Sequence, residues 1–136
     1  GLTDQAADAY DEALTYARQI GEPAGLADAL TNVGDVAYEE QRLDTAVDAY
    51  EEALALRRAF AEQQPGDLGG KRALALALER LADAREDRGH RMRALDLYRE
   101  SLDISGALAS ADPVAYGEDL AITRRRLAEL EDKVMA

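Results

Sequence analysis

One short pattern is written three times in this chain of 136 residues. The three copies are QAADAYDEALTYAR at 5–18, TAVDAYEEALALRR at 45–58 and MRALDLYRESLDIS at 92–105. Each copy has an Ala, a Tyr four residues later, a small residue three positions after the Tyr, and then a Leu. The tyrosines are 40 and 48 residues apart, and a period of this length is typical of units that stack because one unit alone cannot bury its apolar face.

The composition and the apolar spacing both favour helices. The chain is rich in the helix formers Ala, Leu, Glu and Arg, and it has no Trp, one Phe and three Pro. Apolar residues recur three and four positions apart, as at Leu74, Leu78 and Leu81. Such stripes need a partner helix to cover them, so the sequence predicts an all-α fold of packed amphipathic helices.

Prolines, glycines and polar turns divide the chain into six segments. The predicted helices lie at about 3–20, 24–40, 43–63, 71–88, 91–109 and 113–134. The stretch QQPGDLGG at 63–70 is expected to be a linker, and Asp112 is expected to cap the helix that starts at Pro113. Short connections make neighbouring helices antiparallel.

The small and aromatic residues resemble the pattern of the tetratricopeptide repeat family. In that pattern the first helix of a unit carries a large residue, an aliphatic and a small residue, and the second helix carries an Ala, an aromatic and later a Pro. The matching residues here are Leu30, Val33, Gly34, Ala46, Tyr50, Ala53 and Pro65. The resemblance covers nearly the whole chain and implies a right-handed superhelical solenoid of antiparallel helix hairpins.

The units are longer than the usual 34 residues of that family. In this respect they resemble the repeats of kinesin light chains and of bacterial signalling ATPases and transcriptional regulators, and the Ala- and Arg-rich composition suggests a bacterial source. The expected organisation is a single domain, and its parts are a second-type helix at 1–21, a repeat at 22–64, a repeat with an insertion at 65–110 and a capping helix at 111–136. In the last helix, Thr123 and Arg124 are assigned to the aliphatic and small positions.

The resemblance also divides the six tyrosines. Tyr10, Tyr50 and Tyr98 occupy the packing position of the repeat, so they are expected in the core. The tyrosines left free to contact something else are Tyr16, Tyr38 and Tyr116.

The resemblance implies that the first helix of each unit lines a concave groove. The residues expected in this peptide-binding groove are Asp28, Asn32, Asp35, Tyr38, Glu39, Glu79, Arg80, Asp83, Glu86 and Arg125. The set is acidic, with Arg80 and Arg125 as isolated positive points, and the chain has a net charge of −12. We therefore predict a non-catalytic interaction module, part of a larger regulatory or signalling protein, that binds a protein or peptide segment carrying Lys or Arg. The bland alternative is that these carboxylates form an ordinary solvated face.

A structural role is the second function that the sequence suggests. The first helix carries a stripe of small and aromatic residues, namely Ala6, Ala9, Tyr10, Ala13, Tyr16 and Ala17. Such a stripe could pack on another copy of the chain or on a neighbouring domain, which predicts a homo-oligomer.

Composition disfavours several other classes. A strongly acidic chain repels nucleic acid and anionic lipid, and no run of 18 apolar residues is long enough to span a membrane. The chain has no Cys, and its one His, His90, lies in a turn beside Gly89. No metal-ligand spacing or phosphate-binding loop is visible. We expect a cytoplasmic protein that is not an enzyme and needs no cofactor or metal.

Overall fold

A computed structural model describes the backbone of residues 2–136 and the side chains from residue 4 onward. Over this range the chain forms six α-helices and no strand. The helices are α1 (Leu2–Ile20), α2 (Pro23–Glu39), α3 (Leu43–Gln63), α4 (Leu68–Asp87), α5 (Arg91–Ala111) and α6 (Pro113–Met135).

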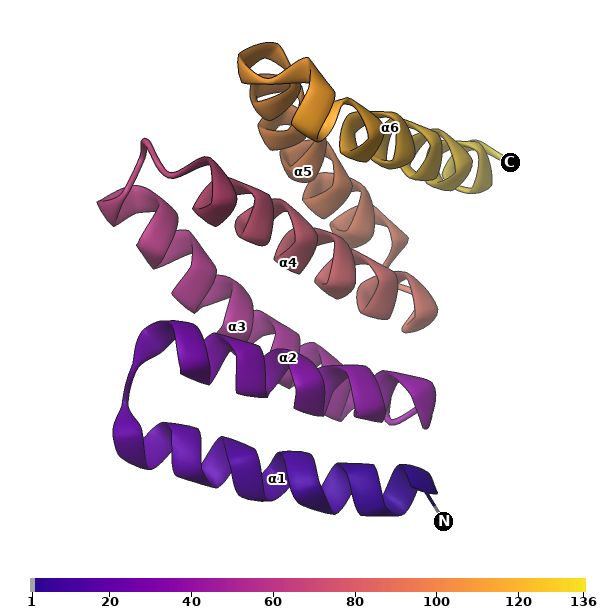
Figure 1. Ribbon diagram of the computed structural model, residues 1–136. Helices are drawn as coiled ribbons and strands as arrows, with labels where there is room; N and C mark the ends of the chain where they lie inside the picture. Colours follow the sequence, from indigo (N-terminus) through magenta and orange to yellow (C-terminus); the bar gives the residue numbers. More distant parts are fainter. Residues whose placement is uncertain (1) are drawn as a thin grey trace.

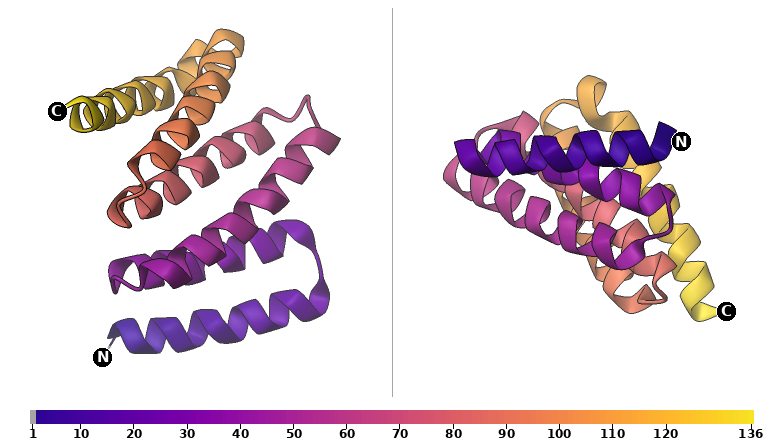
Figure 2. Two further views of the ribbon diagram at one scale, coloured as in Figure 1. Left: turned by 180° about the vertical axis from the view of Figure 1, so that it is seen from behind. Right: turned by 90° about the horizontal axis from the view of Figure 1, so that it is seen from below.

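The helices form an open stack rather than a closed bundle. Each helix packs against the next one along the chain, from α1 on α2 to α5 on α6. α2 and α4 lie on one side of the stack, α3 and α5 lie behind them, and α1 and α6 occupy opposite ends (Figure 1). The view from behind shows the same order (Figure 2). The predicted all-α solenoid of helix hairpins is confirmed.

Two of the repeated tyrosines fill the core, as predicted. Tyr50 and Tyr98 are only 4% and 2% exposed. The Tyr50 ring lies so close to Gly34 that a Cβ at this glycine would come within 2.6 Å of it. Ala82 takes the corresponding place in the core cluster of Tyr98. The small residues of the repeat therefore allow the two helices of each hairpin to pack closely around a tyrosine.

The prediction that Tyr10 is also a core residue is wrong. Tyr10 is 37% exposed although it occupies the same position of the repeat as Tyr50. On α3, the side that carries Tyr50 is covered by α2. α1 packs on α2, but within residues 2–136 no helix covers the equivalent side of α1. Tyr10 is exposed because no helix among the described residues covers this side of α1.

The helix boundaries follow their capping residues. α4 begins at Leu68, three residues before the predicted start, because the Asp67 side chain accepts a hydrogen bond of 2.9 Å from the Gly70 amide and caps the helix there. Asp112 accepts a bond of 3.1 Å from the Ala115 amide, so its predicted role as the cap of α6 is confirmed.

Candidate functional site

The exposed sides of α2 and α4 enclose a hollow of about 430 Å³, which we call the α2–α4 groove. Its lining residues are Asp28, Thr31, Asn32, Asp35, Arg57, Ala73, Leu76, Ala77 and Arg80. Four of the ten residues predicted for a peptide groove therefore lie together here. They come from successive turns of two neighbouring helices, which is the arrangement that the repeat pattern implies.

An apolar hollow of about 270 Å³ adjoins this groove, and we call it the apolar end. Its lining residues are Pro23, Ala24, Ala27, Leu56, Arg57, Phe60, Asp67, Gly69, Gly70 and Ala73. Arg57 and Ala73 line both hollows, so the two lie side by side. The sequence did not reveal the apolar end, because its walls come from three different helices.

The α2–α4 groove contains two carboxylates and two guanidinium groups. Arg57 on α3 forms an ion pair with Asp28, and Nε of Arg80 lies 3.3 Å from the Asp35 carboxylate. The sequence interpretation treated Arg80 as an isolated cation among acids and did not include Arg57. Arg57 was missed because it lies on a second-type helix, whereas only first-type helices were considered as lining.

Asp35 also belongs to the packing between units. The Tyr50 hydroxyl donates a hydrogen bond of 2.5 Å to this carboxylate. Burial of Tyr50, together with this bond to a negative group, raises the pKa of the phenol, so the hydroxyl stays a donor at physiological pH. Asp35 thus joins a tyrosine of its own hairpin to Arg80 of the next first-type helix.

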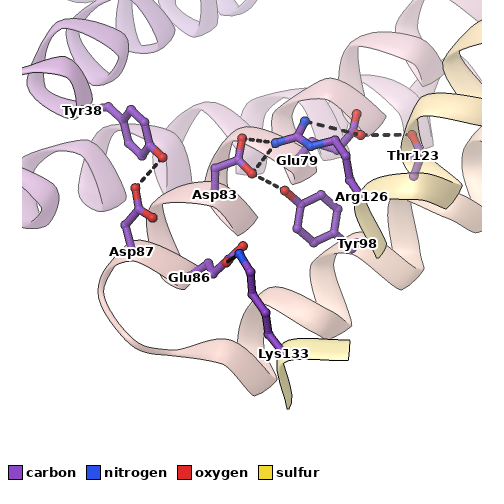
Figure 3. A network of polar contacts seen from close by, with 9 residues as sticks. All are labelled: Tyr38, Glu79, Asp83, Glu86, Asp87, Tyr98, Thr123, Arg126 and Lys133. Carbon is purple, nitrogen blue, oxygen red and sulfur yellow. Dashed lines mark hydrogen bonds and ion pairs between the residues drawn. The ribbon is translucent and has the colours of Figure 1, made fainter. Parts of the chain in front are cut away.

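The same arrangement recurs one unit later (Figure 3). Asp83 accepts a hydrogen bond from the Tyr98 hydroxyl and forms an ion pair with Arg126 of α6. The Arg126 guanidinium also lies over the Tyr98 ring, 5.3 Å from its centroid. Burial, and then the bond to Asp83, raises the pKa of Tyr98 as it does that of Tyr50. Asp83 is therefore a structural contact between consecutive units as well as a residue of the predicted groove.

Glu79 is buried between α4 and α6, with 7% of its surface exposed. The Thr123 hydroxyl donates a hydrogen bond of 3.0 Å to its carboxylate, and Arg126 lies 4.0 Å away (Figure 3). Burial raises the pKa of Glu79, although the bond from Thr123 and the nearby guanidinium oppose the shift. This carboxylate links α4 to α6.

Of the remaining predicted groove residues, two form hydrogen bonds to other helices and two are exposed. The Tyr38 hydroxyl donates a 2.5 Å hydrogen bond to Asp87, and burial with this bond raises the pKa of the phenol. Lys133 donates a 2.9 Å bond to Glu86 (Figure 3). Glu39 and Arg125 are exposed. Tyr38 was predicted to be free for other contacts, but it links α2 to the end of α4.

The counterpart of Arg80 on α6 is Arg126, and the neighbouring Arg125 is exposed. The sequence contains a signal for this register that the spacing argument missed, since RLAD at 80–83 is followed by RLAE at 126–129. The aliphatic and small positions of α6 are therefore those of Leu127 and Ala128. The assignment of these positions to Thr123 and Arg124 was wrong by four residues.

The chemistry of these side chains is that of hydrogen bonding and ion pairing. His90 stands at the start of α5, with its Nδ1 3.3 Å from the Arg85 guanidinium, as expected for a turn residue. Within the side chains described, no group of three or more His, Cys, Asp or Glu residues could hold a metal ion. Among the described helices, none has the length and apolarity needed to cross a membrane.

Comparison with known proteins gives one family. The model of the tetratricopeptide repeat matches residues 1–59, which comprise α1, α2 and most of α3. No curated protein matches the chain.

Proposed function

Through residues 1–59 the chain belongs to the tetratricopeptide repeat family, and on this basis we propose that the α2–α4 groove binds a partner segment that carries Lys or Arg beside a bulky apolar residue. Repeats of this family are generally protein–protein interaction modules. The observation that carries the proposal is that the α2–α4 groove and its apolar end lie side by side and share Arg57 and Ala73 in their walls.

The polar half of the groove suits a cationic side chain. Asp28 is its most exposed carboxylate, with 71% of the side chain accessible, although Arg57 pairs with it. An incoming Lys or Arg can displace Arg57, because exposed ion pairs are worth only about 0–1 kcal/mol. The net charge of −12 favours the approach of a cationic segment, and the exposed Asn32 amide can bond to its backbone.

The apolar end supplies the anchor. Leu56, Phe60 and Ala27 form walls that a Leu-sized or aromatic side chain can contact. Interfaces of this kind obtain most of their affinity from a few such anchors, while charged rim contacts mainly set specificity and association rate. The partner segment therefore needs both features a few residues apart.

Six of the predicted groove residues lie outside the α2–α4 groove. Tyr38, Glu39 and Arg125 extend the surface beyond the groove, while Glu79, Asp83 and Glu86 hold α6 in position. We place the repeats at 22–64 and 65–110, with 1–21 as a second-type helix and 111–136 as a cap. The module is proposed to work in the cytoplasm of a bacterium within a larger regulatory protein.

Selection of binding peptides from a random library tests this function. The selected sequences should combine Lys or Arg with a large apolar residue. Their affinity should fall at least about tenfold, or about 1.4 kcal/mol, in Asp28→Arg, because like charges then meet in the groove. Asp48→Arg makes the same charge change on an exposed position of α3 and should bind normally. Equal affinity for both variants would exclude the α2–α4 groove as the binding site.

Self-association through α1 is the second candidate function. Tyr16 and Ile20 lie one turn apart on this helix and are 65% and 62% exposed, and contiguous exposed apolar patches mark interaction sites.

A further inference from the structure

The same type of contact occurs inside each of the hairpins α2–α3 and α4–α5. In the first, Tyr50 lies on Gly34 and donates a hydrogen bond to Asp35, the residue after that glycine. In the second, Tyr98 donates in the same way to Asp83, which follows a small residue too. A second-type helix is thus fixed on its first-type helix by a tyrosine that packs on a small residue and bonds to the adjacent carboxylate.

α1 carries the tyrosine of this contact, but within the described residues no helix places a small residue and a carboxylate against it. Tyr10, Ala9 and Ala13 are all exposed. Their counterparts on α3 are Tyr50, Ala49 and Ala53, which are 4%, 7% and 2% exposed. The open face of α1 is therefore the face that a first-type helix covers elsewhere in the chain.

α6 presents the complementary half. Its RLAE segment places Ala128 and Glu129 where α4 has Ala82 and Asp83. Ala82 is fully buried in the core cluster with Tyr98, whereas Ala128 is exposed. Glu129 is exposed as well, and within the described side chains no tyrosine hydroxyl donates to it. α6 is therefore a first-type helix whose second-type partner face is open.

α6 as a whole carries five carboxylates against three Arg and one Lys, but two of its arginines lie beside the open face and are opposite in charge to α1. α1 contains four carboxylates and a single Arg. On α6, Arg124 and Arg125 are exposed beside the open face. Opposite charges on two faces that also match in shape favour encounter in one register.

We propose that α1 of one copy of this chain docks on α6 of a second copy, with Tyr10 on Ala128 and its hydroxyl donating to Glu129. The contact rebuilds between two molecules the hairpin that α2–α3 and α4–α5 form within one. It joins two different surfaces of the same protein, so a row of any length keeps one open α1 face at one end and one open α6 face at the other and can grow. The proposed contact identifies α6 as the surface on which α1 packs. It does not depend on the function proposed for the α2–α4 groove.

Sedimentation velocity of the chain over a wide range of concentration, with two end variants, tests the proposal. The average mass should rise beyond that of a dimer as the concentration increases. Tyr10→Glu places a carboxylate against Glu129, and Ala128→Arg fills the place of the ring, so each variant alone should stay monomeric. An equimolar mixture still has one intact α1 face and one intact α6 face, and it should form a dimer that grows no further.

Both substitutions are at exposed positions, so circular dichroism should show native helix content for each. Ala107→Arg, at an exposed position of α5, introduces the same side chain and should associate like the unchanged chain. A chain that is monomeric at every concentration overturns the proposal, and its α1 face then serves a helix of a longer protein or another partner. The proposal is also overturned if Ala128→Arg associates by itself and adding Tyr10→Glu produces no further association. That result would mean that α1 packs on α1.

Discussion

The hydroxyl of Tyr50 lies 2.5 Å from the carboxylate of Asp35. The tyrosine comes from the second helix of one hairpin, and the carboxylate also faces Arg80 of the next hairpin. One residue therefore joins three helices. The repetition of this contact at Tyr98 and Asp83 helps to explain how a chain with few aromatic residues fixes the positions of its units.

Removing the Tyr98 hydroxyl should destabilise the chain. Tyr98→Phe keeps the ring in the core but leaves Asp83 with one fewer donor, and hydrogen bonds to charged groups are worth about 1.5–3 kcal/mol. We expect a loss of about 1–3 kcal/mol in the free energy of unfolding, measured with urea. Tyr16→Phe, at a side chain that is 65% exposed, should change it by less than about 0.5 kcal/mol. Equal effects of the two substitutions would contradict the structural role of the hydroxyl.

Two glycines in helix interiors should respond to Ala with opposite signs. At Gly106 a Cβ meets nothing within 4 Å, so Gly106→Ala should stabilise the chain by up to about 1 kcal/mol through helix propensity. At Gly34 the Cβ would lie 2.6 Å from the Tyr50 ring, and overpacking of this kind costs about 1–3 kcal/mol. Gly34→Ala should therefore be destabilising in thermal unfolding. Stabilisation by both substitutions would show that Tyr50 moves freely.

Glu79 should make stability depend on pH. Burial raises its pKa in the folded chain above the ordinary value of 4.5, so above that value the folded state holds the proton more tightly than the unfolded state. Stability from this group is therefore present at low pH and is lost as the pH rises through the raised pKa. Glu79→Gln keeps an acceptor for Thr123 without the charge.

The Glu79→Gln variant should melt at a higher temperature than the unchanged chain at pH 7. The difference should shrink as the pH approaches 4, where the carboxyl group is protonated in both states. Glu118→Gln, at an exposed position, serves as the control and should show no such trend. A variant that is less stable at pH 7 would mean that the contact with Arg126 outweighs the cost of burial.

Arg57 should compete with a cationic partner for Asp28. Arg57→Gln removes this competitor, so a Lys- or Arg-containing peptide should bind about 2–5-fold more tightly, in line with the 0–1 kcal/mol of an exposed ion pair. Arg42→Gln removes an Arg that pairs with Glu40 outside the groove and should leave the affinity unchanged. Weaker binding by Arg57→Gln, measured by calorimetry, would show that Arg57 itself contacts the partner.

The fold could be predicted because the repeat fixes which faces must be covered. The small residue and the Tyr identify the crossing point of each hairpin, so Tyr50 and Tyr98 were correctly placed in the core. Tyr10 was placed wrongly because the same sequence pattern does not state whether a covering helix is present. The start of α4 was missed because Asp67 caps the helix, and this capping outweighs the low helix propensity of the glycines that follow.

The groove was only partly predictable. Helical spacing placed Asp28, Asn32 and Asp35 on one side of α2, and the structure brings them together with Arg80. Helical spacing could not show which carboxylates are already paired, because Arg57 comes from a second-type helix and Arg126 was hidden by the wrong register assigned to α6. Local charge along the chain therefore overstated how acidic the groove is.

The most direct test of the binding account is a titration of isotopically labelled protein with a selected peptide, followed by backbone amide resonances. The account predicts that the largest changes occur at Asn32 and at Ala73 and Ala77 across the α2–α4 groove, and extend to Gly70 at the apolar end. Changes confined to α1, or to the outer sides of α3 and α5, would contradict it.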